Sequence, residues 1–387
     1  MSTRLVITQP VIQLLNQGSR VSAHLKAPGF SQELWYEVSG CSPSPDGTPF
    51  AIAALLLAMS RGWTLECEAP VSPMWLQATG QIQDIIQLWL PEFQRIEVKA
   101  VTQSLHPTRT AAGTFFSGGV DSYYTYLKHE QAISSLIFVT GFDIPLHKTA
   151  LAQRVSAEIS KTAKALNKHL IEVKTNLREF CDRFVAWRFY HGAALASVAH
   201  LLTQKVGSVY FAATHTYADL FPCGTHPLLD HLWSSEALKI IHDGCEATRF
   251  QKVARLAQSE VALQSLRVCY RNKADELNCA RCEKCLRTMI SLAAVGAMDR
   301  CNTFALPLHP RRVGQLRLGD QPRLLVYVQQ NLNALQERQD QPHLVKAVRQ
   351  SMRRPGLFRR FKRTVKPLVR RSTYLKLLGR SAGKKTD

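Results

Sequence analysis

Residues 117–122, with the sequence Ser-Gly-Gly-Val-Asp-Ser, are the stretch of this chain best suited to chemistry. Two consecutive glycines let the backbone approach an anion closely, because no Cβ stands in the way. The backbone N–H groups of such a turn, and its two serine hydroxyls, are suitable donors to phosphate oxygens. The carboxylate of Asp121 would repel a bare phosphate, so we expect it to act through a bound Mg²⁺. The expected phosphate-binding residues are Ser117, Gly118, Gly119, Val120, Asp121 and Ser122.

A second stretch contains four cysteines within seventeen residues. Three of them are separated by two-residue gaps, a spacing typical of closed tetrahedral thiolate sites. We predict a zinc ion bound by four thiolates, while an iron–sulfur cluster uses the same ligands and stays an alternative. Chance clustering of buried thiols is the less favoured interpretation. The predicted ligands are Cys269, Cys279, Cys282 and Cys285, and the cations that would offset their charge are Lys273, Arg281, Lys284 and Arg287.

Two further segments carry candidate side chains. The polar stretch 214–224 contains His215, which we predict to be a general acid or base; a histidine held by a loop hydrogen bond is the alternative. Arg249 and Lys252 follow the glycine turn at Gly244, a position that suits contact with phosphate. Ordinary solvated cations at the start of a surface helix are the alternative for these two residues.

The elements that must position these residues alternate between strand and helix from residue 111 to 300. This alternation predicts a parallel sheet with helices on both faces. Ligands of such sheets bind at the carboxyl ends of the strands, where the glycine motif and residues 214–224 both fall. We expect strands at 113–116, 135–140, 170–173 and 208–213, and helices beginning after 122, at 148–166 and at 189–202.

The remaining regions differ in composition from this catalytic region at 111–300. Residues 1–110 predict a preceding α/β region of unknown role, with strands at 5–7, 20–25, 34–38, 63–68 and 96–100. Residues 301–352 predict a helical extension. The tail at 353–387 contains thirteen Lys and Arg and one Asp, so it carries +12 of the net charge of +20. Its interleaved apolar and basic residues fit a basic helix on a membrane surface, an RNA-binding arm or a docking segment; a disordered solvated tail is the alternative.

The composition also bounds the class of protein. With 387 residues and 45% hydrophobic residues, the chain can bury a sizeable core. Its longest apolar run, 50–59, is too short to span a bilayer, and the first residues lack a signal-peptide pattern. The clustered cysteines suggest a reducing compartment, so we expect a cytoplasmic protein. We interpret most of Cys41, Cys67, Cys181, Cys223, Cys245 and Cys301 as small buried apolar residues, with Cys223 notable for its polar loop.

The motif at 117–122 resembles the PP-loop, SGGxDS, of the ATP pyrophosphatase superfamily, the adenine nucleotide alpha hydrolase-like (HUP-like) proteins. An ordinary Gly-Gly turn is the alternative, but six matching residues between a strand and a helix favour the resemblance. Members of the superfamily cleave ATP between the α and β phosphates and adenylate a carbonyl or carboxylate oxygen, and a nucleophile then displaces AMP. The resemblance implies ATP and Mg²⁺ as cofactors, with the adenine held near Val139 and Thr140.

With the cysteine cluster included, residues 113–290 resemble 7-cyano-7-deazaguanine synthase and its relatives. Those zinc-containing enzymes adenylate a carboxylate and convert it with ammonia to an amide and then a nitrile. Lys252-Val253 resembles their Thr-Lys-Ala-Glu segment, but about a hundred residues precede the loop here, and the gap from Cys269 to Cys279 is longer. Their Tyr-Pro-Asp-Cys-Arg stretch is matched only by Phe221-Pro222-Cys223. The resemblance therefore implies the activation chemistry and not the deazaguanine substrate.

The sequence thus predicts an AMP-forming ligase that adenylates a small-molecule carboxylate or carbonyl, followed by attack of a nitrogen nucleophile. A tRNA-modifying sulfurtransferase using Cys223, and a nucleotide-binding regulator without turnover, are the alternatives. Expected partners are a small-molecule carboxylate and, through the tail, RNA or an anionic surface; a homodimer stays open. The predicted catalytic residues are Asp121, Ser117, Ser122, Lys252 and His215.

Overall fold

The computed structural model describes residues 3–104, 110–271, 276–319 and 321–354. The chain divides into two compact units. The first comprises residues 1–278 and 300–303, and the second comprises 279–299 and 304–387. Lys273 and nearly all of the predicted basic tail, from residue 355 onward, lie outside the described residues.

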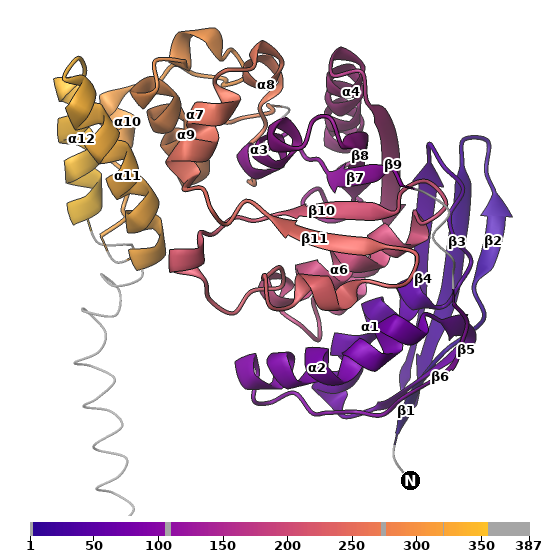
Figure 1. The fold of residues 1–387 in the computed structure, drawn as a ribbon. Helices are drawn as coiled ribbons and strands as arrows, with labels where there is room; N and C mark the ends of the chain where they lie inside the picture. Colours follow the sequence, from indigo (N-terminus) through magenta and orange to yellow (C-terminus); the bar gives the residue numbers. More distant parts are fainter. Residues whose placement is uncertain (1–2, 105–109, 272–275, 320, 355–387) are drawn as a thin grey trace, which may run out of the picture. The chain divides into compact units, whose positions relative to one another are not determined.

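The first unit is a mixed α/β structure built on one sheet, which has eleven strands among the described residues (Figure 1). Strands β7 to β11 pair in parallel, as the alternation of strands and helices predicts. The sheet order is β11-β10-β7-β8-β9-β4-β3-β1-β5-β6, with β2 beside β3. The strands are β1 (Arg4–Ile7), β2 (Val11–Leu14), β3 (Ser19–Ala27), β4 (Phe30–Ser39), β5 (Thr64–Val71), β6 (Val98–Thr102), β7 (Ala112–Phe115), β8 (Ile133–Thr140), β9 (His169–Thr175), β10 (Ser208–Ala212) and β11 (Lys239–Asp243).

Helices of the first unit cover both faces of this sheet (Figure 1). Helix α1 is buried along almost its whole length, with twelve of its fourteen residues inaccessible, because it packs between the sheet and α6. Helices α3 and α4 pack on strands β7 to β10. The helices are α1 (Thr48–Arg61), α2 (Pro73–Trp89), α3 (Val120–Lys128), α4 (Thr149–Ala165), α5 (Leu177–Cys181), α6 (Trp187–Leu201), α7 (Arg249–Leu256) and α8 (Glu260–Ser265).

The N-terminal region belongs to the same sheet as the predicted catalytic region. Strand β4 pairs antiparallel with β9, with Val38 opposite Val173, so residues on either side of position 110 share one layer. The antiparallel pairs β1–β3, β2–β3 and β3–β4 also come from this region. The division of the chain at about residues 110, 300 and 353 stays a prediction.

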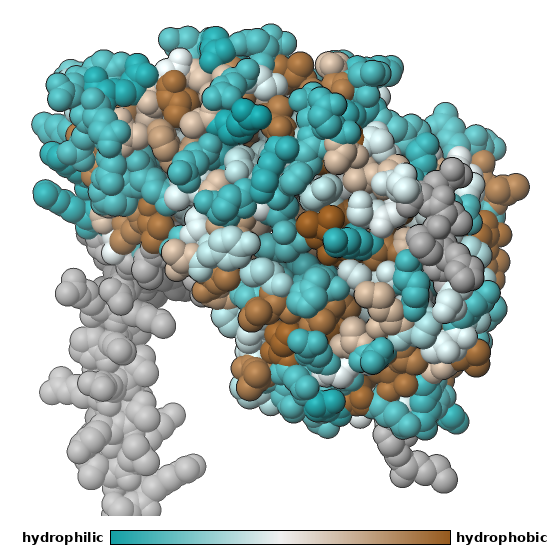
Figure 2. Space-filling model, in the orientation of Figure 1, coloured by the Kyte–Doolittle hydropathy of each residue, from teal (hydrophilic) through white to brown (hydrophobic). Residues whose placement is uncertain are grey.

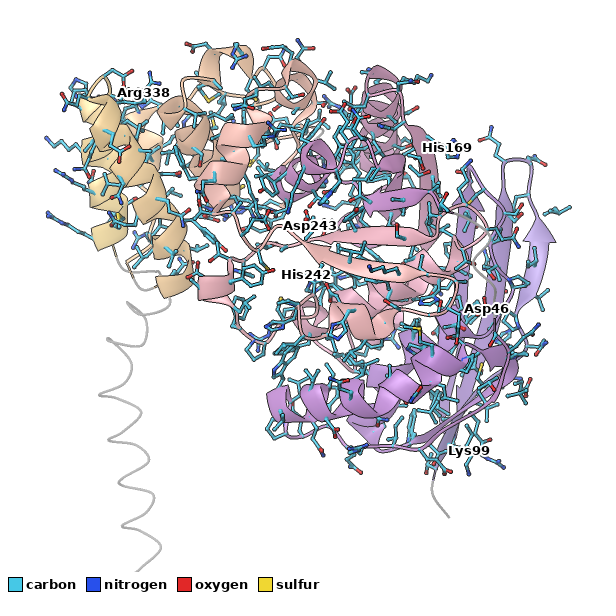
Figure 3. All side chains as sticks on the ribbon, viewed as in Figure 1. Asp46, Lys99, His169, His242, Asp243 and Arg338 are labelled. Atoms are coloured by element: carbon cyan, nitrogen blue, oxygen red, sulfur yellow. The ribbon has the colours of Figure 1, made fainter. Side chains whose placement is uncertain are left out.

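Two strands were not predicted from the sequence. Strand β2 is exposed throughout, so it lacks the alternation of buried and exposed residues that marks a half-buried strand. Strand β11 is five residues long and ends at Asp243, directly before Gly244, so in the sequence it resembled part of a loop. Its omission matters, because β11 carries His242 and Asp243 to the edge of the sheet (Figure 3).

The described part of the second unit is helical. Its helices are α9 (Glu283–Ala294), α10 (Pro310–Gly314), α11 (Pro322–Arg338) and α12 (Pro342–Arg353). Helices α9 and α11 are joined by a buried polar contact, in which the Ser291 hydroxyl donates to Asn331 Oδ1 over 2.7 Å. The amide of Asn331 in turn donates to the carbonyl oxygen of Arg287 over 3.1 Å. These bonds satisfy polar groups inside the helix packing.

In the described part of the chain, no helix combines the length and the apolar character that crossing a membrane requires. On the face drawn in Figure 2, hydrophilic and hydrophobic residues are intermixed.

Helix α6 and the loop after β10 approach each other at two glycines. The N–H of Gly224 donates to the carbonyl oxygen of Arg188 over 2.7 Å. A Cβ on Gly192 would lie only 1.8 Å from the carbonyl oxygen of Gly224. The close backbone approach therefore fixes the polar loop 214–224 on α6 and requires glycine at position 192.

We expect Gly192→Ala to lower the free energy of unfolding by about 3 kcal/mol, because the added methyl group collides with backbone rather than with a flexible side chain. Gly80→Ala in α2 is the matched control, since its new Cβ would meet nothing nearer than Arg95 Nη2 at 3.7 Å. The control should raise the free energy of unfolding by up to about 1 kcal/mol. Denaturant unfolding measures both values, and equal stability of the two variants would contradict the packing described.

Candidate functional site

The glycine motif forms a tight turn between β7 and α3. Strand β7 ends at Phe115 and α3 begins at Val120. Gly118 has a φ of +71°, a conformation that L side chains rarely adopt, and its carbonyl oxygen accepts a hydrogen bond from Arg267 N over 2.7 Å. The Ser122 hydroxyl donates to the carbonyl oxygen of Gly119 over 3.0 Å. The first N–H groups of a helix have no intrahelical acceptor, so this turn presents donors at the positive end of the α3 dipole.

Asp121, in the first turn of α3, is the centre of a charged group. Arg249 Nη2 lies 2.9 Å from Asp121 Oδ2, and Lys252 Nζ lies 3.6 Å from Oδ1. The hydroxyl of Thr214, at the start of the loop after β10, donates to Oδ2 over 3.4 Å. Three residues that the sequence predicts for phosphate binding or catalysis are thus brought together from α3 and α7.

Lys252 is unusual because its side chain is only 1% exposed. Its ammonium donates to the carbonyl oxygen of Ala213 over 2.6 Å and lies 5.5 Å from the centre of the Tyr124 ring. Burial lowers the pKa of Lys252 below its ordinary value, although the negative charge of Asp121 opposes that shift. A buried, charged donor held in one position is suited to contact phosphate with little reorganisation.

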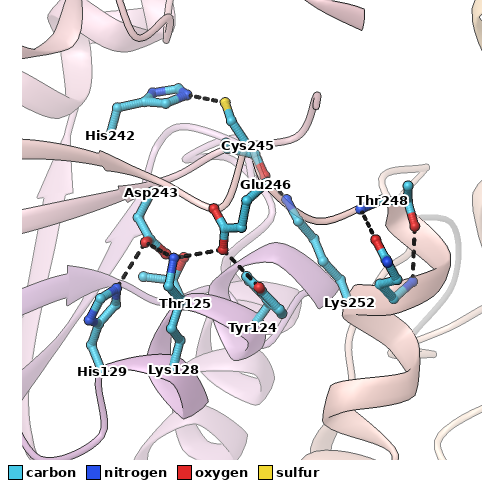
Figure 4. A network of polar contacts seen from close by, with 12 residues as sticks. Tyr124, Thr125, Lys128, His129, His242, Asp243, Cys245, Glu246, Thr248 and Lys252 are labelled. Carbon is cyan, nitrogen blue, oxygen red and sulfur yellow. Dashed lines mark hydrogen bonds and ion pairs between the residues drawn. The ribbon is translucent and has the colours of Figure 1, made fainter. Parts of the chain in front are cut away.

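Local sequence explains how α7 presents its two cations. Thr248 is the N-cap, and its hydroxyl accepts from Gln251 N over 3.2 Å, while Gln251 Oε1 accepts from Thr248 N over 2.8 Å (Figure 4). This reciprocal pair is a capping box, which the sequence Thr-x-x-Gln encodes. It begins the helix at Arg249, so Arg249 and Lys252 lie three positions apart on one face.

The other end of α3 is anchored by Asp243 at the end of β11 (Figure 4). Its buried carboxylate accepts hydrogen bonds of 2.8 Å each from the Thr125 hydroxyl, Lys128 Nζ and His129 Nε2. Burial alone would raise the pKa of Asp243, but the bonds from Lys128, His129 and Thr125 lower it below its usual range. The network ties α3, and so the position of Asp121, to the sheet.

The remaining predicted residues lie elsewhere along the same edge. Val139 and Thr140 are the last two residues of β8, which neighbours β7 on the side opposite β10. They therefore stand across β7 from the loop that follows β10. His215 lies in that loop, with its ring edge-on to Phe221 at 4.5 Å between ring centres. Their predicted roles toward adenine and in proton transfer stay predictions.

The four predicted cysteine ligands are buried together. The sulfur atoms of Cys269, Cys279, Cys282 and Cys285 all lie within 4.8 Å of one another. The Sγ atoms of Cys279 and Cys285 are 4.0 Å apart, close to the separation of about 3.8 Å that a tetrahedral Zn–S site requires. A metal ion such as Zn²⁺ therefore fits these residues.

Local structure also supports the cysteine group. Cys282 is the N-cap of α9, and its sulfur accepts from Cys285 N over 3.4 Å. Ala280 has a φ of +48°, which makes the sharp turn between Cys279 and Cys282. A thiolate at a helix N-terminus is stabilised by the helix dipole, so the two-residue spacing and the helix start act together.

Comparison of the chain with protein-family models, with curated proteins and with solved structures found no match.

Sequence reasoning missed several charged residues at this edge of the sheet. Asp243 was passed over because its strand was not predicted, and its partners on α3 lie more than a hundred positions away. His242 and Cys245 were also missed, and they form a second group with Asp230, which the sequence suggested as a pocket residue; His242 Nδ1 lies 2.7 Å from Asp230 Oδ2. The His-x-x-Cys spacing was the signal in the sequence, but it carries little weight without the strand that precedes it.

We expect the purified protein to contain about one zinc ion per chain, and Cys282→Ser to lower metal content and stability together. Cys301→Ser is the matched control, because Cys301 is buried but lies outside the group. Elemental analysis and thermal unfolding measure the two effects. A brown protein with iron and acid-labile sulfide would instead show an iron–sulfur cluster.

The lowered pKa of Asp243 predicts that the free energy of unfolding depends on pH. Because folding lowers its pKa, its contribution is fully present above the ordinary value of 3.8 and is lost as the pH falls below it. We expect Asp243→Asn to cost about 2 kcal/mol at pH 7 and to flatten the acid limb of the stability curve. Asp84→Asn is the control, since its pair with Arg95 is half exposed and should contribute under about 1 kcal/mol. Parallel acid limbs for wild type and Asp243→Asn would refute the anchor.

Proposed function

We propose that this protein is an AMP-forming ligase. It uses ATP to adenylate a carboxylate or carbonyl oxygen of a small molecule, releases pyrophosphate, and passes the activated group to a nitrogen nucleophile. The observation that carries the proposal is the convergence of Arg249 and Lys252 on Asp121 at the N-terminus of α3. The PP-loop resemblance of residues 117–122 supplies the type of reaction.

Charge favours a polyphosphate at this position. Two cations face one carboxylate, so the group has a net positive charge before any ligand is counted. The positive end of the α3 dipole and the N–H groups of the glycine turn add to it. The guanidinium of Arg249 is suited to bidentate contact with phosphate oxygens, and Lys252 acts as a fixed point charge.

The donor set also fits Mg²⁺. Proteins commonly bind this ion through one or two carboxylates and leave its other positions to phosphate oxygens and water. Asp121 would hold the ion, and when bound it would neutralise charge on the phosphates. Ser117 and Ser122 would donate to phosphate oxygens, which keeps the negative Asp121 from having to contact the anion directly.

The chain's own residues can perform the remaining steps. Lys252 and Arg249 stabilise negative charge where the bond between the α and β phosphates breaks, in a setting shielded from water. His215, at the same edge of the sheet, takes the proton from the attacking nitrogen. The four-cysteine group is structural, because a zinc ion with four thiolates has no open position for substrate.

Asp121→Asn should abolish pyrophosphate release, because the lost charge would hold Mg²⁺. The fold should survive, because the amide oxygen of asparagine can still accept from Arg249 and Lys252. We expect turnover to fall by about a thousandfold or more. The assay detects pyrophosphate and AMP with Mg-ATP across a panel of small carboxylates and tRNA. Asp182→Asn is the control, since Asp182 pairs only with Arg178 on the surface among the contacts described.

Two results would overturn this assignment. One is undiminished pyrophosphate release by Asp121→Asn. The other is ATP cleavage that yields ADP and phosphate instead of AMP. Pyrophosphate release that requires tRNA would favour the sulfurtransferase alternative.

A further inference from the structure

Beside the proposed adenylation site, three side chains are arranged in a line. His242 Nδ1 lies 2.7 Å from Asp230 Oδ2, and His242 Nε2 lies 3.1 Å from Cys245 Sγ (Figure 4 shows the second contact). A thiol, an imidazole and a carboxylate in this order are the parts of an activated nucleophile: the carboxylate orients the ring, and the ring takes the proton of the thiol.

The carboxylate is firmly held and fully buried. Asp230 is 0% exposed, and its Oδ1 accepts from His226 N over 3.1 Å, which leaves Oδ2 facing the ring. Burial alone would lower the pKa of His242, but the bonds and charges of Asp230 and Cys245 more than offset it and raise that pKa to about 9. His242 is therefore able to hold a proton taken from Cys245 near neutral pH.

A metal site does not explain this arrangement. The ring stands between the carboxylate and the sulfur, with each bonded to a different ring nitrogen, so the three groups do not converge on one point. Within the described ranges, the group of side chains placed to share one ion is the four-cysteine group. A simple core cysteine is also a poor description, because such a residue does not need an oriented imidazole.

The position of Cys245 links it to the proposed site for ATP. Its carbonyl oxygen accepts from Tyr217 N over 3.0 Å, in the loop that also carries Thr214, a partner of Asp121. The preceding Gly244 has a φ of +99°, and a Cβ there would lie 3.3 Å from Lys252 Nζ. Burial lowers the pKa of Lys252, and the charges of both Asp121 and Cys245 oppose that shift, so the two groups act on the same ammonium.

We propose that Cys245 is a covalent nucleophile, which accepts the acyl group from the acyl adenylate as a thioester before the nitrogen nucleophile attacks. This inference rests on the proposed function. The thiolate sulfur forms a bond to the carbonyl carbon, the bond from that carbon to the phosphate oxygen breaks, and AMP leaves with the electron pair. The amine then attacks the thioester, and the Cys245 thiolate leaves. The departing thiolate pairs again with protonated His242, and the proton of the amine passes to His215.

Burial suits this role. Cys245 is 2% exposed, so a thioester formed there is shielded from water until the amine arrives. The intermediate also lets AMP leave before the second substrate reacts, which divides one transfer into two steps. The acceptor class is an amine or ammonia, and the donor class is a carboxylate small enough to reach a buried sulfur.

The test uses the full-length protein and acetyl adenylate, a preformed acyl adenylate that bypasses ATP cleavage. Peptide mass spectrometry locates the acetyl group, and neutral hydroxylamine distinguishes a thioester from an amide. We expect acetylation at Cys245 that hydroxylamine reverses, and at least about a hundredfold slower acetylation in His242→Gln. Asp230→Asn should slow it as well, because the ring loses its orientation.

Cys41 is the internal comparison. It is more exposed than Cys245, but burial raises its pKa to about 11, so it should react more slowly although a reagent reaches it more easily. Acetylation of Cys41 before Cys245, or equal rates in wild type and His242→Gln, would overturn the proposal. Circular dichroism of each variant separates loss of reaction from loss of fold, and the wild-type comparison of the two cysteines needs no variant.

The two proposals fail in different ways. Pyrophosphate release from ATP without any acetylation of Cys245 by acetyl adenylate would overturn the thioester and leave the ligase standing. Acetylation of Cys245 in a protein that releases no pyrophosphate with any carboxylate would support the nucleophile and overturn ATP as its source of activation.

Discussion

The buried carboxylate of Asp243 is the constraint on which the candidate site depends. A carboxylate that is nearly inaccessible stays ionised only if donors surround it, and here Thr125, Lys128 and His129 supply three bonds of 2.8 Å. All three donors come from α3 or its C-cap. The bonds that keep the buried carboxylate ionised therefore also fix the helix against the end of β11. The opposite end of the same helix carries Asp121. A rigid connection of about two helical turns therefore transmits the position of β11 to the glycine turn.

A second consequence concerns charge. The edge of the sheet gathers a carboxylate with two cations at Asp121, and a carboxylate with an imidazole and a thiol at Asp230. Lys252 is buried, and the charges of both groups influence its pKa. Burial lowers the pKa of Lys252, and the negative charge of Asp121 opposes that shift. In a region of low dielectric such charges interact more strongly than at the surface. For the proposed reaction, such charges would stabilise the negative charge that develops on phosphate oxygens when AMP leaves, and later on the Cys245 sulfur when the amine displaces it.

Glycines at particular positions allow the backbone conformations that these groups require. Gly118 and Gly244 adopt positive φ values at the two turns, and Gly192 meets the carbonyl oxygen of Gly224 where the loop rests on α6. Each glycine permits an approach or a turn that a side chain would block. The backbone also orients the four-cysteine group. The positive φ of Ala280 and the start of α9 at Cys282 direct neighbouring sulfur atoms inward.

The sequence by itself determined the features whose contacts are local. The glycine turn, the cysteine spacing and the alternation of strands and helices depend on neighbours a few positions apart, so pattern and propensity suffice to predict them. Tertiary structure decided which loops meet. The pairing of β4 with β9 joined the N-terminal strands to the sheet, and the unpredicted β11 brought Asp243 to donors 114 to 118 positions away. It also placed Asp230 beside His242. No local pattern encodes these meetings, because strand order in a sheet is set by long-range packing and burial rather than by the spacing of residues along the chain.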